Sequence, residues 1–500
     1  MSVSEPKDPP AREGLRDFYI FVCAMAAAYV ALIWALSFPP MQDYPMRMFI
    51  AFAAATFDDP QYNWPQFFEL HNSYGSYSFT FWFVRAATPL VGVEAAGKLF
   101  LSLYVVLTGA FALSEARRRR SAPWPLVLLL PLAFNQTYII GFMGYFFSIP
   151  VLLLALRHLG SVADKPLVPR RLAAHMAFQA VIFFCHPFTS SLYGGFGALV
   201  CATKRGRALL RSVVLTGGFC LAFVLWFLSS GSGSAFEANL RWWPLSATLE
   251  FFALMFTGMR IKGGADPLAL ALWCAAAAVI VYCAFRAKRF SPARLDTIML
   301  GLGIAGFLAL PFSPGAPYTY FNIRLVAIVY FFGALVLSYI PVRRKAGMLL
   351  AAVAAGISVW QGALHVNLSR ETAEIKPLLA RMEKNSVILP VMQNGRSAHL
   401  DPVYFYQFHD HGPEYYHFLV GGGATPALID NLPAFPVHYR LPQRMFEVAG
   451  SRRWEDYACC YEYVLARGER LSGLERLGPF RRVAQSGMWT LFEVSPRRLP

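Results

Sequence analysis

The chain has 500 residues, of which 56% are hydrophobic and only 15% are charged, and its mean hydropathy is +0.43. These values exclude a soluble globular protein of this length and indicate a protein of the lipid bilayer. The net charge of +16 does not indicate nucleic-acid binding, because the basic residues form short clusters between apolar runs, the pattern that marks cytoplasmic loops in polytopic proteins.

Apolar segments long enough for membrane helices recur along the chain. The first, residues 18–38, can cross a hydrocarbon core of about 30 Å, and no small-residue cleavage site follows it, so we expect a retained anchor. The other segments are residues 94–114, 122–140, 142–158, 172–186, 188–203, 210–230, 267–285, 296–312, 323–340 and 346–363. Together they predict about eleven transmembrane helices, with a broken or tilted hairpin at His186, where the two pieces are short.

Clusters of Lys and Arg predict the orientation of these segments. They lie at residues 117–120, 157–171, 204–211, 286–294 and 342–345. If all are cytoplasmic, the N-terminus is cytoplasmic as well, provided that the apolar residues 76–91 form an interfacial helix on the outer side with Arg85 at the headgroups. The outer face then receives residues 39–93, the turn 134–145, the turn at His186, the loops 231–266 and 311–324, and everything after about residue 364.

The continuous apolar character ends near residue 364. The stretches NSVILPVM and YEYVLARG have strand length, and FRRVAQSGMWTLFEV has the pattern of two strands joined by a Ser-Gly turn. We therefore predict an α-helical polytopic membrane protein with a cytoplasmic tail over residues 1–17, a transmembrane module over 18–363 and a small extracytoplasmic α/β domain over 364–500.

An acidic residue, Asp43, stands in the segment PPMQDYPMRMFIAFAA just after the first apolar run. Apolar residues at helical spacing predict a helix over 45–57 that lies along the membrane surface. Pro45 suits the first turn of this helix, and Asp43 is placed to cap it. Alternatively, the Asp43 carboxylate faces the mouth of the helix bundle, where a partly desolvated Asp acts as a general base.

A second polar group follows within the same loop. Asp58 and Asp59 precede a proline, which predicts a turn that ends a helix. Glu69 and His71 share a face only if their segment is extended. Neither pair has the character of a metal site, and we predict no metal ligand here.

Cationic side chains recur in the expected outer loops, where the positive-inside tendency makes them rare. They are Arg85, Arg241, Arg260, Lys262 and Arg324. One explanation is binding of a lipid phosphate, since guanidinium groups match phosphate oxygens, and the other is snorkelling to the headgroups. Arg324 is the strongest candidate because it begins an apolar span, where an unpaired charge is costly. His186, in the break of the short hairpin, is either a polar turn residue or a substrate contact.

The segments PPMQDYPMRMFIAFA, FNQTYIIGFMGYFFSIPVLLLAL and YEYVLARGERLSGLERLGPFRRVAQSGMWTLFEV, in this architecture, resemble the GT-C class of membrane glycosyltransferases. The resemblance implies that a hexosyl or pentosyl group moves from a polyprenyl-phosphate sugar to a glycan, lipid or protein acceptor on the outer face of a bacterial cytoplasmic membrane. By position, Asp43 matches the catalytic acid in the first loop of the class. The chain departs from the class in lacking an Asp-x-Asp pair, and Asn135 and Gln136 stand where metal-using members have an acidic motif, so no metal cofactor is expected.

Two other functions remain open from the sequence. A transporter or flippase of lipid-linked envelope precursors is expected to show internal pseudo-symmetry and ionisable residues at the centres of its spans, whereas here the charges gather at span ends. A non-catalytic membrane scaffold that kept the architecture is the third hypothesis. It is favoured by the missing acidic pair.

Overall fold

The computed structural model describes residues 9–71, 75–229, 240–257, 260–261, 264–287, 292–312, 322–400, 408–425, 435–440, 461–468 and 480–494. The chain divides into two compact units. Unit 1 comprises Met1–Ile33, Leu101–Tyr138 and Phe142–Ala363, and unit 2 comprises Trp34–Phe100, Ile139–Gly141 and Leu364–Pro500. Three segments that the sequence assigns to one face of the membrane therefore contribute to a single unit.

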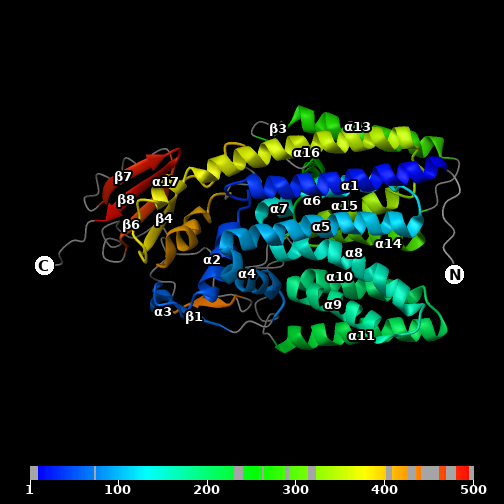
Figure 1. The fold of residues 1–500 in the computed structure, drawn as a ribbon, viewed down its shortest axis with the longest axis horizontal. Helices are drawn as coiled ribbons and strands as arrows, with labels where there is room; N and C mark the ends of the chain where they lie inside the picture. The colour runs from blue at the N-terminus through cyan, green and yellow to red at the C-terminus, as the bar shows by residue number, and fades with distance from the viewer. Residues whose placement is uncertain are drawn as a thin grey trace. The chain divides into compact units, whose positions relative to one another are not determined.

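Unit 1 is built mainly from helices (Figure 1), and the residues of α1, α5, α7 and α16 are divided between the two units. The long helices are α1 (Pro9–Ala35), α5 (Val93–Arg119), α8 (Met143–Ala163), α9 (Pro169–Cys185), α10 (Pro187–Ala202), α11 (Gly206–Ser229), α12 (Leu245–Thr257), α13 (Pro267–Arg286), α14 (Arg294–Ala309), α15 (Ile323–Leu337) and α16 (Arg344–Ala373). Shorter pieces are the 3₁₀ turn η1 (Trp124–Leu128), α6 (Leu129–Ala133), α7 (Gln136–Ile140), β2 (Arg260–Ile261) and β3 (Gly264–Ala265). Helices α8 to α11 pack side by side, and α14 packs on α15.

The helical membrane class predicted from composition is confirmed, but the count of eleven spans is not. Among the described residues, six helices are long and apolar enough to cross a membrane. Predicted spans at 172–186, 188–203, 296–312 and 323–340 correspond to α9, α10, α14 and α15, which have 17, 16, 16 and 15 residues. The predicted span at 122–140 is divided into η1, α6 and α7, because prolines 123, 125 and 131 remove backbone donors along it.

The break predicted at His186 is confirmed. α9 ends at Cys185 and α10 begins at Pro187, and His186 between them has an extended backbone with φ −165° and ψ 128°. Its Nδ1 accepts a hydrogen bond from Phe188 N at 3.1 Å, so the imidazole caps α10. Of the two interpretations of His186, the polar turn residue describes what its side chain does here.

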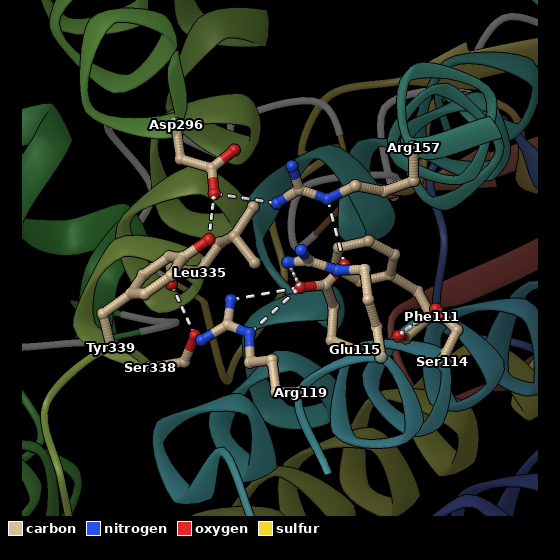
Figure 2. Close-up of polar contacts among 10 residues, drawn as sticks. Phe111, Ser114, Glu115, Arg119, Arg157, Asp296, Leu335, Ser338 and Tyr339 are labelled. Atoms are coloured by element: carbon tan, nitrogen blue, oxygen red, sulfur yellow. Dashed lines mark hydrogen bonds and ion pairs between the residues drawn. The ribbon is translucent and has the colours of Figure 1, made fainter. Parts of the chain in front are cut away.

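A buried charge cluster joins three helices of unit 1 and Tyr339, which follows α15 (Figure 2). Glu115 of α5 is 1% exposed and accepts hydrogen bonds from Arg118, Arg119 and Arg157. Arg157 of α8 also donates to Asp296 of α14 at 2.8 Å. Asp296 accepts a further bond from the Tyr339 hydroxyl, just beyond α15, at 2.9 Å. Part of the basic run at 117–120 thus neutralises a buried carboxylate.

Unit 2 contains short helices and two sheets. Its elements are α2 (Tyr44–Ala55), α3 (Trp64–Phe67), β1 (Phe68–Leu70), α4 (Ser78–Val91), α17 (Lys376–Leu379), β4 (Ile388–Met392), η2 (Gly412–Glu414), the π-helical turn η3 (His417–Gly421), β5 (Val437–Tyr439), β6 (Tyr463–Arg467), β7 (Phe480–Ser486) and β8 (Trp489–Val494). One sheet has the order β4-β6-β8-β7, with β4 parallel to β6 and the other pairs antiparallel (Figure 1). The second sheet consists of β1 paired antiparallel with β5, so the segment that contains Glu69 is extended.

The predicted strands of the C-terminal part are confirmed. NSVILPVM and YEYVLARG contain β4 and β6, and the Ser-Gly turn joins β7 to β8 with Gly487 at φ +54°. One face of this sheet forms an apolar core that includes Leu389, Val464 and Phe492.

Asp59 lies in the turn predicted after the first loop helix, where its Oδ1 accepts a hydrogen bond from Gln61 N at 2.9 Å.

Candidate functional site

Helix α2 begins where the proline pattern predicts, but Asp43 does not cap it. Pro45 occupies the first turn, and Asp43 takes the N-cap position with φ −84° and ψ −4°. Its side chain makes no capping hydrogen bond, so of the two interpretations drawn from the sequence the capping one is wrong. The carboxylate is nevertheless buried, with 12% of the side chain exposed, and it does not point into bulk water.

The backbone around Asp43 is held by the turn that precedes α8. Gln42 N donates to Ile139 O at 2.8 Å, and Asp43 N donates to Ile140 O at 3.0 Å. Gly141 has φ +93°, and a Cβ at that position would lie 2.9 Å from Asp43 N and from Asp43 Cβ. Only glycine fits this approach, because other residues are disfavoured at positive φ and have an atom where Asp43 lies. The backbone that carries the carboxylate is therefore held both by these two hydrogen bonds and by the close approach of Gly141.

Arg47 supplies positive charge next to Asp43. It lies one helical turn along α2 and is 5% exposed. Its Nη2 is 3.4 Å from Asp43 Oδ2, and its Nε donates to Gly141 O at 2.9 Å. One guanidinium thus binds both the carboxylate and the turn that supports it. The sequence analysis did not single out Arg47, although the spacing of four residues from Asp43 on a helix is a signal for such a pair.

Two further ionisable groups approach Asp43 from the C-terminal part of unit 2. His411 Nε2 lies 3.9 Å from Asp43 Oδ1, and His411 Nδ1 lies 3.7 Å from Glu414 Oε1. His411 is 4% and Glu414 1% exposed. Burial by itself lowers the pKa of His411, but the carboxylates of Glu414, Asp43 and Asp410 together raise it above its ordinary value. Burial also raises the pKa of Asp410 to about 6.

This second group was not predicted from the sequence, although a signal for it was present. The run HDHGPE at residues 409–414 places four ionisable residues among six, next to aromatic residues that predict burial. Its distance of more than 360 positions from Asp43 hides the contact from any local pattern. Only the fold brings the two segments together.

A second polar cluster anchors the HDHGPE segment. Glu371, near the end of α16, accepts hydrogen bonds from Ser397 Oγ at 2.6 Å, Ala398 N at 3.0 Å and Arg467 Nη2 at 2.9 Å. His409 Nε2 lies 3.1 Å from the same carboxylate. Arg467, at the end of β6, is fully buried and also donates to the carbonyl of Arg396 at 2.9 Å. The sheet, α16 and the HDHGPE segment are thereby joined through one carboxylate.

In unit 1, Arg324 is buried at the start of α15. It is 7% exposed, and its guanidinium lies over the Phe142 ring at 4.8 Å from the centroid. The Tyr145 hydroxyl donates to the Arg324 carbonyl. Arg324 Nε and the neighbouring Asn322 Oδ1 have no hydrogen-bond partner among the described residues, and Asn322 stands at the N-cap without capping the helix. A buried guanidinium of this kind is a ready site for an anion.

The other cationic residues predicted from the sequence are either exposed or have side chains outside the described residues. Arg85, on α4 of unit 2, and Arg241, in unit 1, are both exposed. Arg260 lies in β2, and its side chain is outside the described residues, as is the whole of Lys262. Within the described part of unit 2, the cation found beside Asp43 is Arg47, which the sequence analysis did not propose.

The side-chain amide of Asn135 stabilises the second predicted outer turn. Asn135 Oδ1 accepts bonds from Thr137 N at 2.8 Å and Thr137 Oγ1 at 2.6 Å, and its Nδ2 donates to Leu132 O at 2.9 Å. The amide of Asn135 is thus used within the turn. Across the ranges that the structure describes, no group of three or more His, Cys, Asp or Glu side chains is arranged to hold a metal ion.

Comparison with known proteins finds similarity at the level of structure only. No family model matches the chain, and no curated protein matches it. Among solved structures, the chain is similar to ArnT from Cupriavidus metallidurans bound to undecaprenyl phosphate, with a TM-score of 0.49 and 14% identity over 95% of this chain and 97% of that one. It is also similar to the same protein in the apo state, with a TM-score of 0.43 and 14% identity over 94% and 97%. Since both TM-scores are below 0.5, the roles of individual residues depend on the contacts within this chain.

Proposed function

We propose that this chain is a membrane glycosyltransferase, which moves a hexosyl or pentosyl group from a polyprenyl-phosphate sugar to a glycan, lipid or protein acceptor. The observation that carries the proposal is the Asp43 carboxylate, which is buried, does not cap its helix and faces two nitrogen-bearing side chains, those of Arg47 and His411. A buried carboxylate held in this way has the properties of a general base.

The reaction that we propose is a single displacement at the anomeric carbon. The acceptor hydroxyl oxygen forms a bond to this carbon while the bond from the carbon to the phosphate oxygen breaks, and the electron pair leaves with the polyprenyl phosphate. The hydroxyl proton passes to Asp43. Attack on the side opposite the leaving phosphate inverts the anomeric configuration. Positive charge that binds the phosphate lowers the barrier, because negative charge develops there as the bond breaks.

Arg324 is the residue that we propose for the lipid phosphate. Its Nε has no partner in the described part of the chain, and its burial makes an unpaired charge costly. Arg324 also lies in the first turn of α15, where the positive end of the helix dipole favours an anion. Arg85, His186, Arg241, Arg260 and Lys262 stay candidates for donor contacts. No step in the proposal requires a metal.

The cellular setting is part of the proposal. The six apolar helices support a multi-pass protein of the bilayer. We infer that the membrane is a bacterial cytoplasmic membrane, with the N-terminus in the cytoplasm, residues 39–93 on the outer face and residues 364–500 as an extracytoplasmic domain. The basic clusters at the predicted inner ends of the spans support this orientation.

Complementation of a deletion strain tests the function. Wild-type chain and an Asp43→Asn variant are expressed to equal levels, and envelope glycans and lipid-linked sugars are measured by mass spectrometry. We expect one lipid-linked sugar to accumulate and one glycan modification to disappear in the deletion and in the variant, since loss of a general base costs about 10²- to 10⁴-fold in rate. Full complementation by Asp43→Asn contradicts the proposal and favours a scaffold. Accumulation of the donor on the inner leaflet only favours a flippase.

A further inference from the structure

An imidazole stands between two buried carboxylates in unit 2. His411 Nε2 is 3.9 Å from Asp43 Oδ1, and His411 Nδ1 is 3.7 Å from Glu414 Oε1, so the two ring nitrogens face different carboxylates. The charged groups that act on the ring are the carboxylates of Asp43, which precedes α2, of Glu414 in η2 and of Asp410 in the preceding turn. Arg47 pairs with Asp43 and Arg467 acts on Asp410, which leaves a surplus of negative charge among these groups. A protonated His411 reduces that surplus.

The separations leave Asp43 Oδ1 without a hydrogen bond from His411. Both ring distances exceed the usual limit for a hydrogen bond, which is about 3.2 Å for N–H···O. His411 Nδ1 and Glu414 Oε2 have no hydrogen-bond partner among the described residues. The imidazole therefore acts on Asp43 through its charge, and a lone pair of the carboxylate stays available for the acceptor hydroxyl.

The position of His411 is fixed by groups that do not touch Asp43. Gly412 N donates to His409 O at 2.8 Å, and His409 N donates to Gly395 O at 2.9 Å, so the segment is tied into a tight turn. The side chain of His409 meets the Glu371 carboxylate, which Arg467 of β6 also binds. The C-terminal sheet thus anchors His409, two residues before His411, through the Glu371 carboxylate.

We propose that His411 is a positioning residue for Asp43: its positive charge balances Asp43 and Glu414 and holds the Asp43 carboxylate in place to accept the proton of the acceptor. This inference rests on the proposed function, because it assigns His411 a role in the same proton transfer. It makes the C-terminal part of unit 2 a component of the catalytic apparatus.

The sign of the pH dependence follows from the surroundings of His411. Burial lowers its pKa, but Glu414, Asp43 and Asp410 raise the pKa above its ordinary value, so the charged form persists to higher pH than in a free imidazole. This charge is lost as the pH rises through the raised pKa. We therefore expect wild-type transfer activity to decline towards alkaline pH as that pKa is passed, with His411 as the titrating group.

The first arm of the test compares pH profiles of kcat/KM for the full-length wild type, His411→Gln and His411→Ala in detergent. The donor probe is the lipid-linked sugar extracted from the deletion strain. We expect both variants to lose about tenfold or more at neutral pH and to lose the alkaline decline, and added imidazole to restore activity to His411→Ala. His417→Gln is the matched control, because His417 is a buried histidine of the same segment that bonds Gly422 O and Thr425 Oγ1.

The second arm does not depend on transfer. The pKa of His411 is measured by NMR of labelled histidine in wild type, Asp43→Asn and Glu414→Gln, and we expect it to fall in both variants. A wild-type profile retained by His411→Gln, or a His411 pKa that is indifferent to Asp43, overturns the inference. If the wild type transfers no sugar while the pKa of His411 still depends on Asp43, the proposed function fails and the electrostatic coupling stands.

Discussion

Gly141 lies against Asp43 so closely that a Cβ at position 141 would come within 2.9 Å of the Asp43 nitrogen. The same glycine gives its carbonyl to Arg47 Nε, and Arg47 reaches back to the Asp43 carboxylate. The turn before α8 and the start of α2 therefore form one rigid support. The orientation of the carboxylate depends on both.

We expect Gly141→Ala to abolish sugar transfer while the protein still inserts and folds. The new methyl group must displace Asp43, and φ +93° is disfavoured for alanine, at a cost of about 1–3 kcal/mol in the free energy of unfolding. The measurements are transfer activity and the unfolding midpoint. Gly92→Ala is the control, because Gly92 has φ +79° but nothing within 4 Å of the position of its Cβ. Equal activity in the two variants would contradict the importance of the contact.

Arg324→Gln is expected to weaken binding of the proposed polyprenyl phosphate by about tenfold or more, since a charge-assisted contact with a phosphate contributes about 1.5–3 kcal/mol. The measurement is a titration of the purified protein in nanodiscs with a polyprenyl phosphate. Arg343→Gln makes the same change at an exposed arginine of unit 1 and should leave binding unchanged. Unchanged affinity in Arg324→Gln would remove Arg324 from the proposal.

The pH dependence of stability should report on Asp410. Burial raises its pKa to about 6, so the folded state binds a proton more tightly than the unfolded chain does between the ordinary value of 3.8 and about pH 6. This stabilising contribution is present at low pH and is lost as the pH rises through about 6. We expect the difference in unfolding midpoint between wild type and Asp410→Asn to favour wild type more at pH 5 than at pH 7. The opposite trend, or no trend, would show that the carboxyl titrates normally.

Glu115→Gln is expected to destabilise unit 1 without changing the affinity for the proposed polyprenyl phosphate. The change leaves the half-buried guanidinium groups of Arg119 and Arg157 without the buried Glu115 carboxylate, and breaking a buried charge pair costs up to about 3–5 kcal/mol (Figure 2). Unfolding in a denaturing detergent series measures the loss. Glu13→Gln, which removes an exposed partner of Arg344, should have a much smaller effect. A similar small effect for Glu115→Gln would show that the cluster is not a main source of stability.

Much of the helical architecture could be predicted, because a bilayer imposes length and apolarity on each segment independently of its neighbours. Helices α5, α8, α10 and α13 begin close to the positions that the apolar runs indicate. The strand pair around Gly487 could likewise be predicted, from the residues of its turn. The burial of α2 could not be predicted, since the sequence indicated an amphipathic helix on the membrane surface. In the structure, ten of the twelve residues of α2 are buried.

The candidate site divides in the same way. Asp43 stood out because a carboxylate beside an apolar run is costly unless it has a role, and Arg324 stood out for the same reason. The side chains that face Asp43 were not predicted from the sequence, because Arg47 was one of many arginines and His411 lies hundreds of positions away. Local periodicity carries no information about contacts between distant segments.

By itself, the sequence determined that this protein belongs in a membrane and which two charges are out of place there, because transfer free energies act residue by residue. The tertiary structure decided what those charges meet. Whether Asp43 caps a helix or faces Arg47 and His411 depends on the close approach of Gly141 and on the turn at 409–414, and such approaches are set by packing among segments that no local pattern connects.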